Sequence, residues 1–132
     1  MKAEVKRLGS YRCELTVNGH QMILDQAPER GGDGEGANPL AHLAGALGVC
    51  KLMVAHAYCQ RRGIELESAE ATVEVLEVGP ESKPEEVFDC QVYIRAQMSD
   101  DERVRFERAL KTCHIGRIIE EPHEVRQTLH FD

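Results

Sequence analysis

One long apolar segment constrains the fold more than any other part of the chain. From Leu40 to Arg62 the sequence contains no acidic residue and no proline, and its first half is apolar on almost every side. Asn38 and Pro39 form a typical helix start, because Asn caps a helix and Pro is tolerated in its first turn. Gly63 is a typical helix end. The sequence therefore predicts one long, buried helix.

The length of this helix makes it difficult to bury. About 22 residues span roughly 33 Å at a rise of 1.5 Å per residue. The chain has 132 residues, so we expect a single domain, residues 1–132. One thin sheet would cover such a helix poorly, and we therefore expect a second subunit to help. Gly45 and Gly48 lack side chains and would let another backbone approach the helix.

Short strands are predicted on both sides of the long helix. Asn18-Gly19 is the strongest two-residue signal for a hairpin turn. Apolar and polar residues alternate in several segments, as expected of half-exposed strands. The predicted strands cover residues 2–8, 12–17, 20–26, 69–79, 87–96 and 124–131. Together with the helix, these strands predict an α+β protein with antiparallel sheets wrapped around a central helix.

Two shorter helices are expected near the end of the chain. Ser99 is placed to cap a helix over residues 99–111, whose first turn is acidic. Thr112 resembles a second cap, which would place Cys113 in the first turn of a short helix ending near Ile119. Unpaired backbone N–H groups in that turn would stabilise a Cys113 thiolate.

The charge balance argues against several classes of function. The chain has 16 basic and 23 acidic residues, a formal net charge of -7. Non-specific nucleic-acid binding needs a cationic face, and a peripheral membrane anchor needs a polybasic patch. The first ten residues lack the apolar run of a signal peptide, and His and Lys side chains interrupt the long apolar segment. We expect a cytoplasmic protein without nucleic-acid or membrane partners.

Two of the five cysteines are candidates for redox chemistry. A structural disulfide framework is not expected in the cytoplasm. Cys50 lies in the middle of the long helix, and Cys113 lies at the start of a late one. Each could also be a small buried hydrophobic residue. Cys13, Cys59 and Cys90 are expected to pack without chemistry.

No metal or nucleotide cofactor is expected. His42, His56 and His114 accompany cysteines along the chain, but the CxxC and HxxxH spacings typical of zinc ligands are missing. The loop over residues 27–37 is rich in glycine but lacks the GxxxxGK[ST] pattern of a phosphate-binding loop. Its acidic residues would also repel phosphate.

The segments ERGGDGEGANPLAHLAGALGVC and KTCHIGR together resemble the OsmC/Ohr family of osmotically inducible and organic hydroperoxide resistance proteins. The shared pattern is an Arg in a glycine-rich loop, an Asn-Pro helix start, a Cys in the helix and a second Cys opening a late helix. The order of predicted elements also resembles the family along nearly the whole chain. The resemblance implies an OsmC-like fold in an intertwined homodimer, with its long helices back to back.

The resemblance also implies antioxidant reduction of organic or other small hydroperoxides by thiols. Cys50 aligns with the family's peroxidatic cysteine, Cys113 with its resolving cysteine and Arg30 with the Arg that holds the thiolate. Cys50 would become a sulfenic acid and close a disulfide with Cys113, which a dithiol reductant (lipoyl-type or a small thiol) would reduce. Leu40 stands where peroxidatic members carry Glu, which favours an alternative: a non-catalytic OsmC-like redox sensor or a dimer binding a small apolar ligand.

Overall fold

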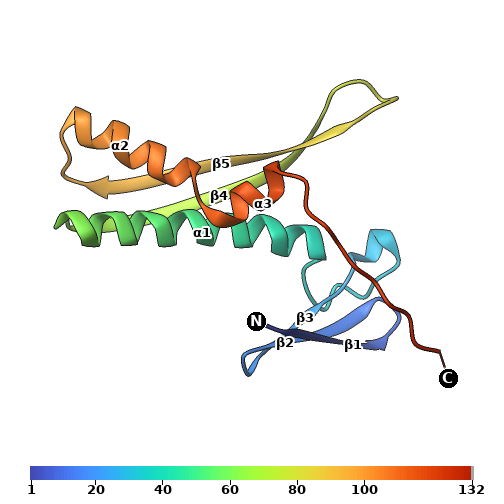
Figure 1. Ribbon diagram of the computed structural model, residues 1–132. Helices are drawn as coiled ribbons and strands as arrows, with labels where there is room; N and C mark the ends of the chain where they lie inside the picture. The colour runs from blue at the N-terminus through green and yellow to red at the C-terminus, as the bar shows by residue number, and fades with distance from the viewer. Residues whose placement is uncertain (132) are drawn as a thin grey trace. The chain divides into compact units, whose positions relative to one another are not determined.

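The computed structural model describes residues 1–131 and contains two compact units, Met1–Gly45 and a second that begins at Ala46. The chain is an α+β protein with two antiparallel sheets and one long helix, as predicted (Figure 1). The elements are β1 (Ala3–Gly9), β2 (Arg12–Val17), β3 (His20–Leu24), the 3-10 helix η1 (Pro28–Arg30), α1 (Pro39–Arg62), β4 (Leu66–Val78), β5 (Glu85–Ala96), α2 (Asp100–Lys111) and α3 (His114–Glu120).

The first unit is built on a three-stranded antiparallel sheet in the order β1-β2-β3. Asn18 and Gly19 connect β2 to β3 with φ angles of 50° and 80°. Both angles lie in the left-handed region that a type I′ hairpin turn requires, and Asn and Gly tolerate this region best. The predicted hairpin is therefore confirmed, although β3 ends at Leu24 rather than at residue 26.

Helix α1 begins and ends where the sequence predicts. The side-chain oxygen Oδ1 of Asn38 accepts a hydrogen bond from the backbone N–H of Ala41 at 2.8 Å. At the other end Gly63 adopts a φ of 66°, and the Ile64 N–H donates to the Cys59 carbonyl at 2.9 Å. This pattern closes the last turn of a helix and satisfies a carbonyl that would otherwise lack a partner.

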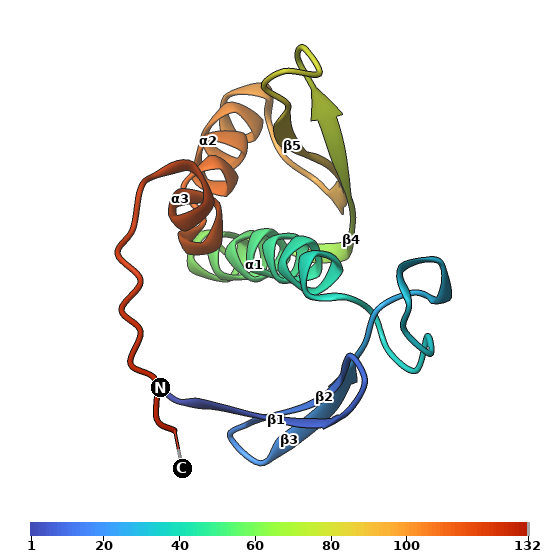
Figure 2. The ribbon, with the colours of Figure 1, turned by 90° about the vertical axis from the view of Figure 1, so that its right-hand side faces the viewer.

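In the second unit, α1 and α2 pack against each other and against the β4–β5 hairpin (Figure 2). Gly48 allows a close approach, because a Cβ at this position would lie 3.3 Å from Cγ2 of Val73 in β4. Gly45, by contrast, faces open space. The core between the two helices and the hairpin consists of five buried residues from α1 and α2: Ala55, Tyr58, Cys59, Phe106 and Leu110.

The structure buries α1 on one side only. On the opposite side Val49 is 52% exposed and Met53 is 67% exposed. By length and composition alone α1 could cross a membrane. Its packing against the hairpin and α2 is that of a core helix in a soluble protein.

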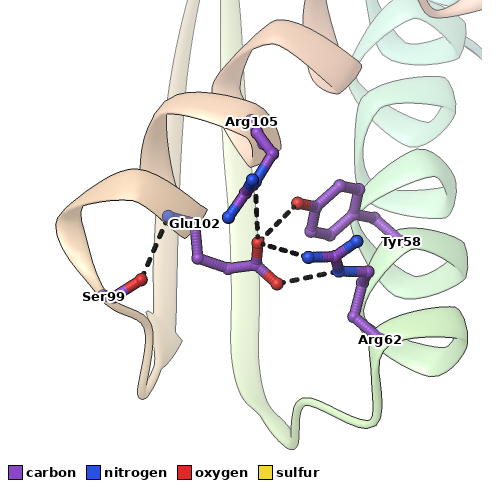
Figure 3. A network of polar contacts seen from close by, with 5 residues as sticks. All are labelled: Tyr58, Arg62, Ser99, Glu102 and Arg105. Atoms are coloured by element: carbon purple, nitrogen blue, oxygen red, sulfur yellow. Dashed lines mark hydrogen bonds and ion pairs between the residues drawn. The ribbon is translucent and has the colours of Figure 1, made fainter.

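Glu102 in the first turn of α2 joins this helix to the end of α1 (Figure 3). Its carboxylate accepts hydrogen bonds from Arg62 at 3.0 and 3.1 Å, from the Tyr58 hydroxyl at 3.1 Å and from Arg105 at 3.3 Å. Its backbone N–H donates to the Ser99 hydroxyl at 3.2 Å, which confirms Ser99 as the helix cap. One residue therefore both starts α2 and fastens it to α1.

Two predictions about the end of the chain are wrong. Residues 124–131 form no strand in the structure, and the apolar side chains Val125, Leu129 and Phe131 are exposed. An alternating segment becomes a strand only when a neighbouring strand pairs with its backbone, and this segment has no such partner within residues 1–131. Thr112 does not cap α3, because it ends α2 and its hydroxyl donates to the Ala109 carbonyl at 2.8 Å.

We predict that Glu102→Gln destabilises the protein in a pH-dependent way. The Arg62 hydrogen bond is the main cause that lowers the pKa of Glu102 below its usual value of 4.5. A lowered pKa means that the ion pairs stabilise the fold above pH 4.5 and lose this effect as the pH falls through the lowered value. Urea titrations should show a gap between wild type and variant at pH 7 that closes below pH 4.5.

Glu107→Gln is the matched control, since Glu107 is an exposed carboxylate of α2 outside this network. It should leave the urea midpoint nearly unchanged. A gap for Glu102→Gln that stays constant from pH 7 into acid would contradict a role for the ionised carboxylate.

Candidate functional site

Cys113 lies at the junction between α2 and α3, and its side chain is buried, with 1% of the residue exposed. It is the residue before the first turn of α3, rather than a member of that turn as predicted. The side chain makes no capping hydrogen bond to α3. The expected stabilisation of a thiolate by the N–H groups of α3 is therefore absent from this conformation. Thr112 belongs to α2, so α3 starts one residue later than predicted and Cys113 is its N-cap.

The sulfur of Cys113 packs against Gly116 of α3. A Cβ added at Gly116 would lie 2.9 Å from Sγ of Cys113 and 3.6 Å from Cδ1 of Leu47. Gly116 is buried, so the absence of its side chain is what makes room for the sulfur. Leu47 of α1 thus packs against the same turn that holds Cys113.

Cys50 is half-buried on α1 and lies three residues after Leu47. Residues three apart are neighbours on one face of a helix, because each residue turns the helix by about 100°. Cys50 therefore lies within one helical turn of Leu47, the residue of α1 that packs against Gly116. This arrangement places the two predicted redox cysteines in the same unit and on elements that pack together.

Lys51, the next residue of α1, forms a second group with Cys90 of β5. The Lys51 ammonium donates to the Leu110 carbonyl, in the last turn of α2, at 3.1 Å. Lys51 and Cys90 both line a cavity of about 450 Å³ that Leu47 and Gly116 also line. They also line a second cavity, of about 340 Å³, that borders Leu110.

Burial raises the pKa of the Cys90 thiol above its usual value. The Lys51 ammonium opposes this shift, whereas the charges of a Cys113 thiolate and of Asp89 add to it.

Arg30, the predicted partner of the Cys50 thiolate, belongs to the first unit. It is the exposed last residue of η1, and its backbone N–H donates to the Ala27 carbonyl at 2.9 Å. Since Arg30 and Cys50 lie in different units, their pairing stays a prediction.

Asp25 organises the loop that carries Arg30. Its carboxylate is 2% exposed and accepts hydrogen bonds from the backbone N–H groups of Gln26, Asp33 and Glu35 at 2.7, 3.3 and 3.1 Å. Burial raises its pKa, but these three donors and the charge of Arg12 outweigh burial and hold the pKa below its usual value. The loop is thus an ordered structure built around one carboxylate.

The sequence analysis missed Lys51 and Cys90 as a pair. The alternation of residues 87–96 does place Cys90 on the same strand face as Phe88 and Val92, and this face meets α1. Lys51 was visible as a charge within an apolar helix. Nothing in the sequence connected these residues, because they are distant along the chain and meet only when β5 packs on α1.

The histidines considered as metal ligands do not form such a site. Among residues 1–131, no three His, Cys, Asp or Glu side chains gather as ligands of a metal ion would. His114 is an exposed residue at the start of α3.

We predict that Gly116→Ala destabilises the fold by about 1–3 kcal/mol, the usual cost of overpacking a core. The added methyl group would collide with Sγ of Cys113. In a Cys113→Ala background the colliding sulfur is gone, so the same substitution should cost much less. The four proteins of this double-mutant cycle can be compared by urea unfolding. An equal penalty in both backgrounds would contradict the packing of the sulfur against Gly116.

Comparisons with known proteins agree with this fold. The similar solved structures include an OsmC like protein from Mycoplasma pneumoniae (TM-score 0.73, 19% identity, 91% of this chain and 88% of that chain). They also include an organic hydroperoxide resistance protein OsmC from Legionella pneumophila (TM-score 0.66, 20% identity, 90% of this chain and 89% of that chain). At these identities the similarity establishes the fold alone. No curated protein sequence matches. The family model described as OsmC-like protein matches residues 32–127, and the chain therefore belongs to the OsmC family.

Proposed function

We propose that this protein is a thiol-dependent peroxidase that reduces organic or other small hydroperoxides. The observation that carries the proposal is that Cys50 lies within one helical turn of Leu47, which packs against Gly116 next to Cys113, in a chain of the OsmC family. The hydroperoxide resistance named for the Legionella structure supports a peroxide-related role. The proposal treats residues 1–132 as one OsmC-like domain acting in the cytoplasm.

The reaction has three balanced steps. The Cys50 thiolate attacks the distal oxygen of the hydroperoxide, so the O–O bond breaks, Cys50 becomes a sulfenic acid and an alcohol leaves after protonation. Cys113 then attacks the sulfenic sulfur, which forms the Cys50–Cys113 disulfide and releases water. A dithiol reductant, lipoyl-type or a small thiol, finally exchanges with this disulfide and restores both thiols.

Arg30 is proposed to hold the Cys50 thiolate. Asp25 keeps the Arg30 loop ordered through three backbone hydrogen bonds, so the guanidinium starts from a defined loop. Leu40 cannot orient an Arg as a carboxylate would, because an apolar side chain accepts no hydrogen bond.

We further propose that the protein works as an intertwined homodimer. The side of α1 that the single chain leaves open carries Val49 and Met53, and the C-terminal segment exposes Val125 and Phe131. Large exposed apolar side chains on one helix face typically mark a protein–protein interface. A second copy of the chain would cover this face of α1 and supply a pairing partner for the C-terminal segment.

Leu40 favours a second candidate function, a non-catalytic OsmC-like redox sensor or a dimer that binds a small apolar ligand. The first unit has an apolar cavity of about 320 Å³, lined by residues that include Tyr11, Cys13 and Leu15. Turnover distinguishes the candidates. A sensor would oxidise once without rapid cycling, and a ligand-binding protein would keep its affinity after replacement of both Cys50 and Cys113.

We predict that one equivalent of an organic hydroperoxide converts the reduced protein to a Cys50–Cys113 disulfide within seconds. Non-reducing peptide mass spectrometry locates the bond while hydroperoxide loss is followed in parallel. Cys50→Ser should abolish peroxide reduction, and Cys113→Ser should stop at a Cys50 sulfenic acid. Cys13→Ser, a change in β2 of the first unit, is the control and should behave as wild type. Slow oxidation scattered over all five cysteines would refute the peroxidase.

We predict that Met53→Lys shifts the protein from dimer to monomer in light scattering at micromolar concentration. A charge at the exposed side of α1 costs little in one chain but is unfavourable inside an apolar interface. Tyr93→Lys is the control, because Tyr93 is 59% exposed and lies on β5. A wild-type protein of monomeric mass would rule out the dimer.

A further inference from the structure

Cys113 lies too deep for direct contact with a dithiol reductant. Only 1% of this residue is exposed, and its sulfur packs against Gly116. Cys90, in contrast, lines two cavities of the second unit, those of about 450 and 340 Å³. Of the two thiols, Cys90 is the one that a molecule entering a cavity can reach.

Cys90 shares cavities with residues on both sides of Cys113 along the chain. One cavity joins Cys90 to Gly116, three residues after Cys113, and the other joins it to Leu110, three residues before. Gly116, which borders the larger cavity with Cys90 and Leu47, is also the residue that the Cys113 sulfur packs against. Cys90 of β5 therefore shares these cavities with the two residues that flank Cys113 at the α2–α3 junction.

Lys51 provides a positive charge at this place. Its ammonium lines both cavities together with Cys90 and is held by the Leu110 carbonyl at 3.1 Å. A cation next to a thiol favours the thiolate, and the thiolate is the form that attacks a disulfide. Lys51 thereby opposes the effect of burial on Cys90.

We propose that Cys90 is a third redox-active thiol. It attacks the Cys50–Cys113 disulfide at Cys113 and so forms a Cys90–Cys113 disulfide beside the cavities. The exchange step rests on the proposed peroxidase function, whereas the pairing of Cys90 with Cys113 does not.

The exchange balances without an added oxidant. The Cys90 thiolate attacks the Cys113 sulfur of the Cys50–Cys113 disulfide, so the Cys90–Cys113 bond forms as the Cys50–Cys113 bond breaks. Cys50 leaves as a thiolate and takes from solvent the proton that Cys90 released. The disulfide becomes reachable from a cavity, and Cys50 is free to meet a second hydroperoxide before the reductant arrives.

The test is a time course of disulfides in the full chain after one equivalent of an organic hydroperoxide, without reductant. Peptide mass spectrometry should show the Cys50–Cys113 bond first and the Cys90–Cys113 bond growing at its expense. A second equivalent should then convert Cys50 to a sulfenic acid that dimedone traps. Cys90→Ser and Cys90→Ala should both stop at Cys50–Cys113 and show no dimedone adduct at Cys50.

Lys51→Gln should slow the exchange, while Lys111→Gln, a change at an exposed residue that lines only the smaller of the two cavities, should not. A Cys50–Cys113 bond that persists unchanged in wild type, with the same hydroperoxide consumption as Cys90→Ser, would overturn the proposal and leave the peroxidase intact.

If no Cys50–Cys113 bond forms at all, the peroxidase fails, and the pairing is then tested directly. Diamide, which oxidises thiol pairs to disulfides, is added to the Cys50→Ser variant. A Cys90–Cys113 disulfide would support the pairing on its own, and its absence would overturn it.

Discussion

The packing of one side of α1 in the second unit determines where the thiols of that unit lie. Gly48 brings the helix close to Val73 of β4. Neighbouring residues of α1 line a cavity together with residues of β5 and α3. A bulkier residue at Gly48 would separate helix and sheet by a few tenths of an ångström, a distance that matters because interiors are close-packed. Leu47 and Lys51, on either side of Gly48 along α1, line the same cavity.

The polar groups of the second unit serve to hold its helices in place. Glu102 fastens the start of α2 to the end of α1, and Lys51 fastens the end of α2 to the middle of α1. Both contacts cross the same helix pair, one at each end of α2. The α2–α3 junction, and Cys113 within it, is therefore held between a packed core and a lysine at the last turn of α2.

Local signals explain why much of this fold was predictable. The limits of α1 follow from Asn38 and Gly63, and the first hairpin follows from Asn18 and Gly19, because caps and turns depend on neighbours along the chain. The C-terminal strand was not predictable in the same way. Its pattern is that of a strand, but a strand also needs a second backbone to pair with, and the chain does not supply one within residues 1–131.

The sequence by itself determined the α+β class, the long helix and two cysteines at a spacing typical of the OsmC family. Only the tertiary structure decided that Cys113 is buried behind Gly116, and that Cys90 and Lys51 share two cavities next to it. The physical reason is that the helix and strand patterns of a sequence state which face of each element is apolar. They do not state which residues of other elements that face will meet.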